Sequence, residues 1–163
     1  MMGSGKTTIG KKLAREIGLD FIDLDREIER LNGVAISTIF EIEGESGFRV
    51  RESQILAELS KVTGKVIATG GGAVLDPANR SRLMGSCSVV YLHACPNLLY
   101  ARTCHDKKRP LIQVADPLTR IRELVIRRDP LYREVADVIV EAGDNMTNIV
   151  EQIKISINSL CRH

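Results

Sequence analysis

The chain opens with Met1-Met2-Gly3-Ser4-Gly5-Lys6-Thr7-Thr8, and this octet restricts the possible fold more than any other segment. It matches the end of the pattern G-x-x-x-x-G-K-[ST], in which a glycine-rich loop leads into a helix. Backbone N–H groups of such a loop, with the positive end of the helix, bind phosphate oxygens. We expect Lys6 to bridge the β- and γ-phosphates of a nucleotide and the Thr7 hydroxyl to bind Mg²⁺. The predicted nucleotide-binding residues of the octet are Gly3, Ser4, Gly5, Lys6, Thr7 and Thr8.

The octet also begins part-way through its pattern. The leading glycine would lie one residue before Met1, and no strand pattern precedes the loop. We therefore expect a parallel sheet that lacks one strand. Our hypothesis is that the natural protein starts upstream and that Met1 is an internal residue of the loop.

The composition excludes several classes of protein. A chain of 163 residues with 44% hydrophobic and 27% charged side chains predicts one domain over residues 1–163. A net charge of +2 and strand-sized apolar stretches give no basis for nucleic-acid binding or for a membrane span. The four cysteines form no C-x-x-C pair, which is typical of free thiols in a reducing compartment. We expect a cytoplasmic monomer.

Helical and strand patterns alternate along the whole chain, which predicts an α/β fold with a mostly parallel sheet. The expected strands cover residues 20–24, 65–69, 88–93 and 137–141. The expected helices cover residues 6–17, 25–31, 37–43 (with Ser37 as a cap), 45–62, 96–103, 116–128 and 146–160, with one more after Asp76-Pro77. Asp129-Pro130 is expected to end the helix that precedes it.

Asp23 and Asp25 form an Asp-x-Asp motif at the end of the first strand pattern. Ligands of open α/β sheets bind beyond the carboxyl ends of the strands, so both carboxylates are placed for function. One can hold Mg²⁺ through water, and the other can accept a proton from a hydroxyl nucleophile. A helix cap is the alternative, and for Asp25 both roles can hold together.

Gly70-Gly71-Gly72 follows the second strand pattern directly. A plain turn needs one or two glycines, so three in a row predict close approach of backbone N–H groups to a substrate or phosphate.

Three arginines in separate segments, Arg49, Arg109 and Arg133, are candidates for binding carboxylate or phosphate. Phosphoryl transfer depends mainly on positioning and charge neutralisation, which planar bidentate donors supply. The basic stretch of residues 103–115 is typical of a lid that closes over a nucleotide, whereas Lys107 and Lys108 fit solvated surface charges.

Six segments together resemble the shikimate kinases, which are P-loop proteins of the nucleoside-monophosphate-kinase-like group. The segments are M-G-S-G-K-T-T-I-G, F-I-D-L-D-R-E-I-E, F-R-V-R-E, T-G-G-G-A-V, K-K-R-P-L and D-P-L-Y-R-E-V-A-D, and they span residues 2–137. The resemblance implies a three-layer α/β/α fold with strand order 2-3-1-4-5, so the missing first strand is the central one. A segment of about residues 25–62 would bind the substrate, and residues 103–115 would form the lid.

The resemblance also implies a reaction and roles for residues. The reaction is transfer of the γ-phosphate of ATP to the 3-hydroxyl of shikimate, with Mg²⁺, on the pathway to chorismate and the aromatic amino acids. Asp25 would hold the reacting hydroxyl as candidate base, and Asp23 would assist Thr7 at the metal through water. The further implied contacts are Arg49 and Arg133 to the shikimate carboxylate, Glu52 to Arg49, Gly70, Gly71 and Gly72 to the ring, Arg109 to the transferring phosphate, and Arg102 to adenine.

Other functions remain open at this point. A different kinase of the same fold, acting on gluconate or a nucleoside, is the nearest alternative, and the Arg49/Arg133 pair favours a carboxylate substrate over it. A weakly active or non-catalytic relative is the alternative from another class. Such a relative is expected to lose Lys6 or Asp25, and both are present.

Overall fold

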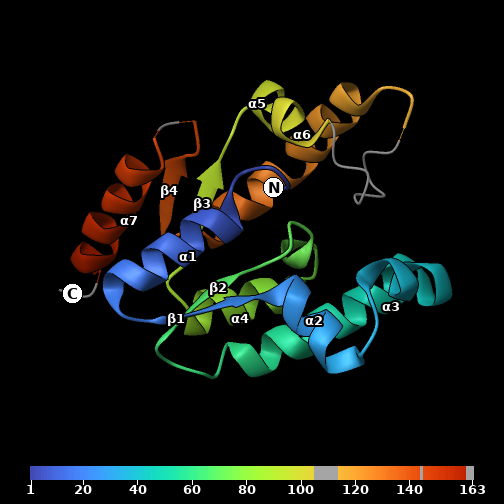
Figure 1. Cartoon of the computed structure of the whole chain (residues 1–163), viewed down its shortest axis with the longest axis horizontal. Helices are drawn as coiled ribbons and strands as arrows, with labels where there is room; N and C mark the ends of the chain where they lie inside the picture. Colours follow the sequence, from blue (N-terminus) through green and yellow to red (C-terminus); the bar gives the residue numbers. More distant parts are fainter. Residues whose placement is uncertain (105–113, 144, 161–163) are drawn as a thin grey trace. The chain divides into compact units, whose positions relative to one another are not determined.

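The computed structural model describes residues 1–104, 114–143 and 145–160 (Figure 1). Its internal contacts divide the chain into two compact units. The first consists of Met1–Lys6 with Ser88–His163, and the second of Thr7–Cys87. We call them the split unit and the continuous unit and describe each by itself. The expectation of one domain over residues 1–163 stays a prediction.

Helices and strands alternate along the described chain, as the sequence predicts for an α/β fold. The elements are α1 (Lys6–Ile17), β1 (Asp20–Asp23), α2 (Leu24–Asn32), α3 (Ile36–Leu59), β2 (Lys65–Ala68), the 3₁₀ helix η1 (Ala73–Leu75), α4 (Pro77–Ser86), β3 (Val90–His93), α5 (Pro96–Thr103), α6 (Pro117–Val135), β4 (Val138–Glu141) and α7 (Met146–Leu160).

The four described strands form two parallel pairs. In the continuous unit β1 pairs with β2, from Asp20 opposite Lys65 to Asp23 opposite Ala68. In the split unit β3 pairs with β4, from Val90 opposite Val138 to His93 opposite Glu141. Among the described residues no ladder joins the two pairs. These pairings are the ones that remain in the order 2-3-1-4-5 when the first strand is left out.

The carboxylate of Asp23 fixes where β1 ends and α2 begins. Its Oδ1 accepts hydrogen bonds from the backbone N–H groups of Asp25 and Arg26, so Asp23 is the N-cap of α2. The helix therefore starts at Leu24, one residue before the expected position, and the strand is one residue shorter. The capping role considered for Asp25 belongs to Asp23.

The expected break between two helices is confirmed: within α3 the backbone of Gly44 is non-helical (φ 70°, ψ −174°), and one helix lies on each side of it. Ser37 is not the cap of α3. The helix begins after Ala35, which offers no side-chain acceptor, and the N–H of Ile36 donates instead to Glu29 Oε1 of α2 at 3.0 Å. An acceptor seven residues earlier, on the preceding helix, is not part of an N-cap motif, which explains the wrong prediction.

Helix α6 continues past Pro130 to Val135, although the sequence predicted that it would end near Arg128. Proline has no N–H, so the carbonyl four residues earlier, that of Ile126, loses its helical donor. Ile126 is 76% exposed, and water can take the place of that donor. The helix therefore tolerates the proline, and Arg128 lies within the helix rather than at its C-terminal end.

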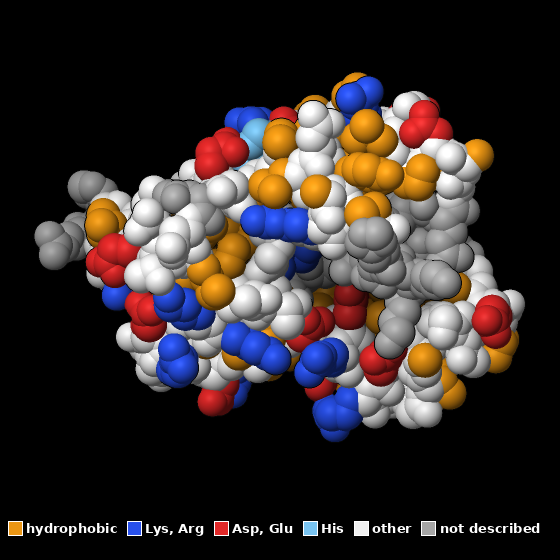
Figure 2. Space-filling model, turned by 45° about the horizontal axis from the view of Figure 1, so that its top comes forward, with side chains coloured by type: hydrophobic (Ala, Val, Ile, Leu, Met, Phe, Trp, Pro, Cys, Tyr) orange, Lys and Arg blue, Asp and Glu red, His pale blue; other side chains and the backbone are white. Residues whose placement is uncertain are grey.

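Each unit has its own apolar core. Leu24, Ile28 and Leu56 are buried in the continuous unit, and Leu99, Ile121, Ile149, Val150 and Ile153 in the split unit. Apolar side chains also reach the surface at the top of the view in Figure 2, where Figure 1 places α5 and α6. Among the described helices we find none that is both long and apolar enough to cross a membrane.

Candidate active site

The phosphate loop lies in the split unit and has the conformation that its glycines predict. Gly3 and Gly5 have φ values of 72° and 90°, a region that other residues rarely adopt. Ser4 is fully buried, and its Oγ donates to the carbonyl of Met1 at 2.9 Å. Lys6 Nζ donates to the same carbonyl at 2.6 Å. The ammonium group is thus held over the loop, close to the N-terminus of α1.

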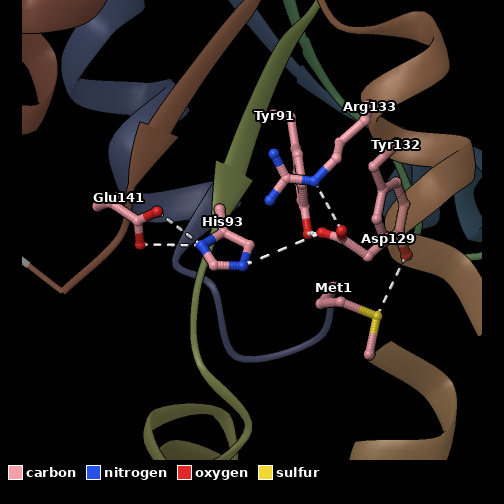
Figure 3. A network of polar contacts seen from close by, with 7 residues as sticks. All are labelled: Met1, Tyr91, His93, Asp129, Tyr132, Arg133 and Glu141. Atoms are coloured by element: carbon pink, nitrogen blue, oxygen red, sulfur yellow. Dashed lines mark hydrogen bonds and ion pairs between the residues drawn. The ribbon is translucent and has the colours of Figure 1, made fainter. Parts of the chain in front are cut away.

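Residues distant in sequence hold this loop in place. Met1 is 4% exposed, and its sulfur accepts a hydrogen bond from the Tyr132 hydroxyl of α6 at 3.3 Å (Figure 3). Arg102 at the end of α5 donates to the carbonyl of Gly3 at 3.3 Å and to that of Ala142, after β4, at 3.1 Å. Arg102 therefore links the loop to the end of the β3–β4 pair.

Thr7 and Asp23, the two predicted Mg²⁺ residues, meet in the continuous unit. Thr7 Oγ1 donates to Asp23 Oδ2 at 2.7 Å, and the other carboxylate oxygen caps α2. Both groups offer the hard oxygen atoms that Mg²⁺ prefers. Within the described residues no cluster of three or more His, Cys, Asp or Glu side chains could hold a metal. The oxygen atoms of Thr7 and Asp23 therefore fit a Mg²⁺ ion that takes its remaining ligands from water and phosphates.

The metal hypothesis gives a direct prediction. Thr7→Val keeps the side-chain volume but removes the hydroxyl, so we expect the Mg²⁺ concentration for half-maximal activity to rise about tenfold, the loss of one oxygen ligand. Thr63→Val, which changes an exposed hydroxyl in the loop before β2, is the matched control. Equal Mg²⁺ dependence of both variants in a magnesium titration would exclude Thr7 as a ligand.

Asp25, a predicted substrate residue, and Glu52, the predicted partner of Arg49, come together in the continuous unit beside the glycine segment after β2. A Cβ atom added to Gly70 would lie 2.6 Å from Glu52 Oε1 of α3 and 3.1 Å from Asp25 Oδ1 of α2. Asp25 is exposed, whereas Glu52 is fully buried. Two carboxylates therefore converge beside Gly70, one open to a ligand and the other enclosed.

Glu52 holds Arg49, as the resemblance implied. Arg49 Nη1 donates to Glu52 Oε2 at 2.6 Å, and Nη2 lies 3.0 Å from Glu45 Oε1. Burial by itself would lower the pKa of Arg49, but the two carboxylates outweigh it and raise that pKa. The guanidinium also lies 5.1 Å from the ring of Phe48. Arg49 is thus a fixed, permanently charged donor.

Gly72 makes room for that guanidinium. A Cβ atom at Gly72 would lie 2.2 Å from Arg49 Cζ, well inside contact distance. The sequence predicted that the three glycines let backbone N–H groups come close to a substrate or phosphate, and this stays a prediction. The structure gives a further reason for two of them: the side chains of Arg49 and Glu52 already occupy the space over Gly72 and Gly70.

Arg133, predicted to bind a carboxylate, has an internal partner in the split unit (Figure 3). Its Nε donates to Asp129 Oδ2 at 2.7 Å, and Asp129 Oδ1 accepts from the Tyr91 hydroxyl at 2.8 Å. Burial would raise the pKa of Asp129, but the Arg133 and Tyr91 hydrogen bonds outweigh it and lower that pKa. His93 lies beside this pair, with Nε2 at 4.0 Å from Asp129 and Nδ1 at 2.7 Å from Glu141.

The comparison with known proteins decides which family these features belong to. The family model for shikimate kinase matches residues 2–158. The chain belongs to the shikimate kinase family. A shikimate kinase of Aromatoleum aromaticum is 52% identical to it over 168 residues, covering 100% of this chain and 96% of the relative.

Solved structures agree with the family assignment and with the α/β P-loop kinase fold. The shikimate kinase from Acinetobacter baumannii, in complex with shikimate, is 46% identical with a TM-score of 0.94, covering 97% of this chain and 89% of that one. A gluconokinase from Sinorhizobium meliloti is 18% identical with a TM-score of 0.61, covering 98% and 89%, and shares the fold alone. The recognition of this shikimate kinase family member from its motifs is therefore confirmed.

The structure of this shikimate kinase family member adds one candidate site residue that the sequence did not indicate. Arg128 of α6 is 4% exposed, whereas the side chain of Arg133 is 48% exposed. The buried positions of α6 are Ile121, Leu124, Arg128, Tyr132 and Val135. They follow helical spacing, so the periodicity itself could have placed an arginine on the apolar face. A charged side chain is seldom buried without a functional or structural partner.

Arg109 and residues 105–113 of the predicted lid lie outside the described residues. The described ends of that segment are Thr103 and Cys104, at the end of α5, and residues 114–115, just before α6.

Proposed function

We propose that this chain transfers the γ-phosphate of ATP to the 3-hydroxyl of shikimate, with Mg²⁺ as cofactor. The observation that carries the proposal is the cluster of Asp25, Arg49, Glu52, Gly70 and Gly72 in a member of the shikimate kinase family. The cluster combines an exposed carboxylate with a fixed guanidinium. These are the groups needed to activate a hydroxyl and to bind a carboxylate on one small molecule.

Asp25 acts as the base in this proposal. Its carboxylate is exposed on α2 and close to Gly70, where it can accept a hydrogen bond from the 3-hydroxyl. The nearby Glu52 is fully buried and pairs with Arg49, whereas Asp25 is exposed, which favours Asp25 as the carboxylate that contacts substrate. Gly70, Gly71 and Gly72 would offer backbone contacts to the ring.

The phosphate loop and its neighbours serve ATP. Gly3 to Thr8 would surround the phosphates, and Lys6 would exchange the Met1 carbonyl for phosphate oxygens. Thr7 and Asp23 would hold Mg²⁺, supported by their 2.7 Å contact. Arg102, which contacts Gly3, would lie against adenine, and Arg109 would neutralise the transferring phosphate. When bound, Mg²⁺ would neutralise charge on the phosphate oxygens.

Arg49 would bind the shikimate carboxylate together with an arginine of α6. The sequence favoured Arg133 for this second position, but its guanidinium already pairs with Asp129. Arg128 is the stronger candidate because it is buried. A desolvated guanidinium forms stronger charge-assisted hydrogen bonds than an exposed one.

Substitutions of Arg128 and Arg133 test which of the two binds the shikimate carboxylate. We expect Arg128→Gln to raise the KM for shikimate about 10- to 100-fold, because hydrogen bonds to charged groups contribute roughly 1.5–3 kcal/mol. Arg133→Gln should change it less than about threefold, as expected for an exposed ion pair. Arg127→Gln, at an exposed position of the same helix, is the control. The reverse order of effects between Arg128 and Arg133, measured in well-folded variants, would return the role to Arg133.

A substrate panel tests the function. In a coupled assay of ADP release we expect ATP turnover with shikimate and none above background with gluconate or a nucleoside monophosphate. Turnover with gluconate or a nucleotide instead would favour the alternative kinases of the same fold. ATP binding without turnover on any of them would favour a non-catalytic relative.

A further inference from the structure

Helix α4 fixes the backbone that follows the glycine segment. The residues of η1 come directly after Gly72, and their carbonyls accept hydrogen bonds from α4 side chains. Asn79 Nδ2 donates to the carbonyl of Ala73 at 3.0 Å, and Arg80 Nη1 donates to that of Val74 at 2.9 Å. Ala73 is fully buried, so its carbonyl depends on Asn79 rather than on solvent.

The amide oxygen of Asn79 contacts α3. Asn79 Oδ1 accepts from Ser53 Oγ at 2.8 Å and from Arg82 Nη1 at 3.0 Å, and Arg82 also donates to Ser53 Oγ at 3.1 Å. Ser53 is the residue after Glu52, the buried partner of Arg49. Asn79 is 1% exposed, and both its amide oxygen and its amide nitrogen are used. One buried side chain therefore joins α3 to the backbone that follows Gly72.

The Asn79 hydrogen bonds join two segments whose packing leaves no spare space. Arg49 and Glu52 of α3 occupy the space over Gly72 and Gly70, at distances that leave no room for a single added carbon atom. A sliding of η1 along α3 would change the position of the glycine backbone relative to the Arg49 guanidinium. Interiors packed this closely transmit such shifts rather than absorb them.

We propose that Asn79 is a positioning residue for the carboxylate-binding subsite, and that with Ser53 it sets the position of Gly70–Gly72 on the Arg49–Glu52 face of α3. The proposal rests on the proposed function for the identity of the substrate. The position of the glycine segment does not depend on that identity. Because Thr7, Asp23 and the phosphate loop take no part in the Asn79 hydrogen bonds, the effect should fall on shikimate and not on ATP.

Steady-state kinetics of Asn79→Ala provide the test. We expect the KM for shikimate to rise about tenfold and the KM for ATP to stay within about twofold, since only one subsite is displaced. Ser53→Ala removes a single hydroxyl and should give a smaller rise, about threefold, in the same direction. It keeps the test available if Asn79→Ala does not fold. Ser81→Ala, whose Oγ bonds only within α4, is the control and should match the wild type.

An unchanged KM for shikimate, or a rise matched by the KM for ATP, would overturn the proposal in whichever variant folds. If the wild-type chain does not use shikimate, the proposed function fails and amide hydrogen exchange decides the positioning role. Faster exchange over residues 69–75 in Asn79→Ala, but not in Ser81→Ala, supports that role. Exchange equal to that of the wild type refutes it.

Discussion

Asp25→Asn should reduce kcat by a factor of about 10²–10⁴ while leaving the affinity for ATP nearly unchanged, because a positioned general base contributes about that much. Asparagine keeps the size of the side chain and can still contact a hydroxyl, but it cannot take the proton. In the structure Asp25 is exposed on α2 beside Gly70, and its proposed role concerns the hydroxyl rather than the nucleotide phosphates, so nucleotide binding should depend on it little. Steady-state rates and a nucleotide titration measure the two effects separately.

Glu27→Gln is the matched control for this substitution. Glu27 is another carboxylate of α2, paired with Arg30, and its loss should leave kcat unchanged. Parallel loss of turnover and ATP binding in Asp25→Asn would show that the residue supports the fold or the nucleotide site. Full activity would exclude the base role.

Gly72→Ala is the second substitution with a large expected effect. The added Cβ would lie 2.2 Å from Arg49 Cζ, so the guanidinium must leave its place. Gly72 has φ −97° and ψ −6°, which alanine adopts without strain, and the displaced group is the end of a flexible side chain. Its displacement disrupts the ion pair with the fully buried Glu52, so thermal stability should fall, and the KM for shikimate should rise about 10- to 100-fold with the loss of a charged hydrogen-bond donor.

Thermal unfolding and the two KM values separate these effects. Gly85→Ala in α4 is the control, since no atom lies near its added carbon, and it should leave the kinetics unchanged. If Gly72→Ala binds shikimate as well as the wild type does, Arg49 can act from another position and the observed geometry is not required.

The parts of the fold that the sequence predicted correctly are those with local causes. The Pro96 start of α5, the Asp76-Pro77 start of α4 and the strand patterns all depend on residues within a few positions of each other. The wrong predictions depend on distant or solvent partners. Ser37 was expected to cap a helix whose first N–H is satisfied by Glu29, and Pro130 was expected to end a helix whose open carbonyl faces solvent.

The residues of the candidate site also fall into those that local motifs predict and those that depend on packing. Motifs indicated Lys6, Thr7, Asp23, Asp25 and Arg49, because the chemistry of phosphoryl transfer restricts residue type and spacing. The choice among arginines of α6 depends on burial, and the motif P-L-Y-R drew attention to the exposed Arg133 rather than to Arg128. The packing of Arg49 on Gly72 and the hydrogen bond from Ser53 to Asn79 each join residues more than twenty positions apart. No local pattern encodes such contacts.

The central claim is that this chain phosphorylates the 3-hydroxyl of shikimate. The most direct test is ³¹P and ¹H NMR of the product formed from ATP, Mg²⁺ and shikimate. We predict one phosphate ester, at carbon 3, formed in equal amount to ADP. ATP hydrolysis without a phosphorylated shikimate, or a phosphate at another hydroxyl, would contradict the account.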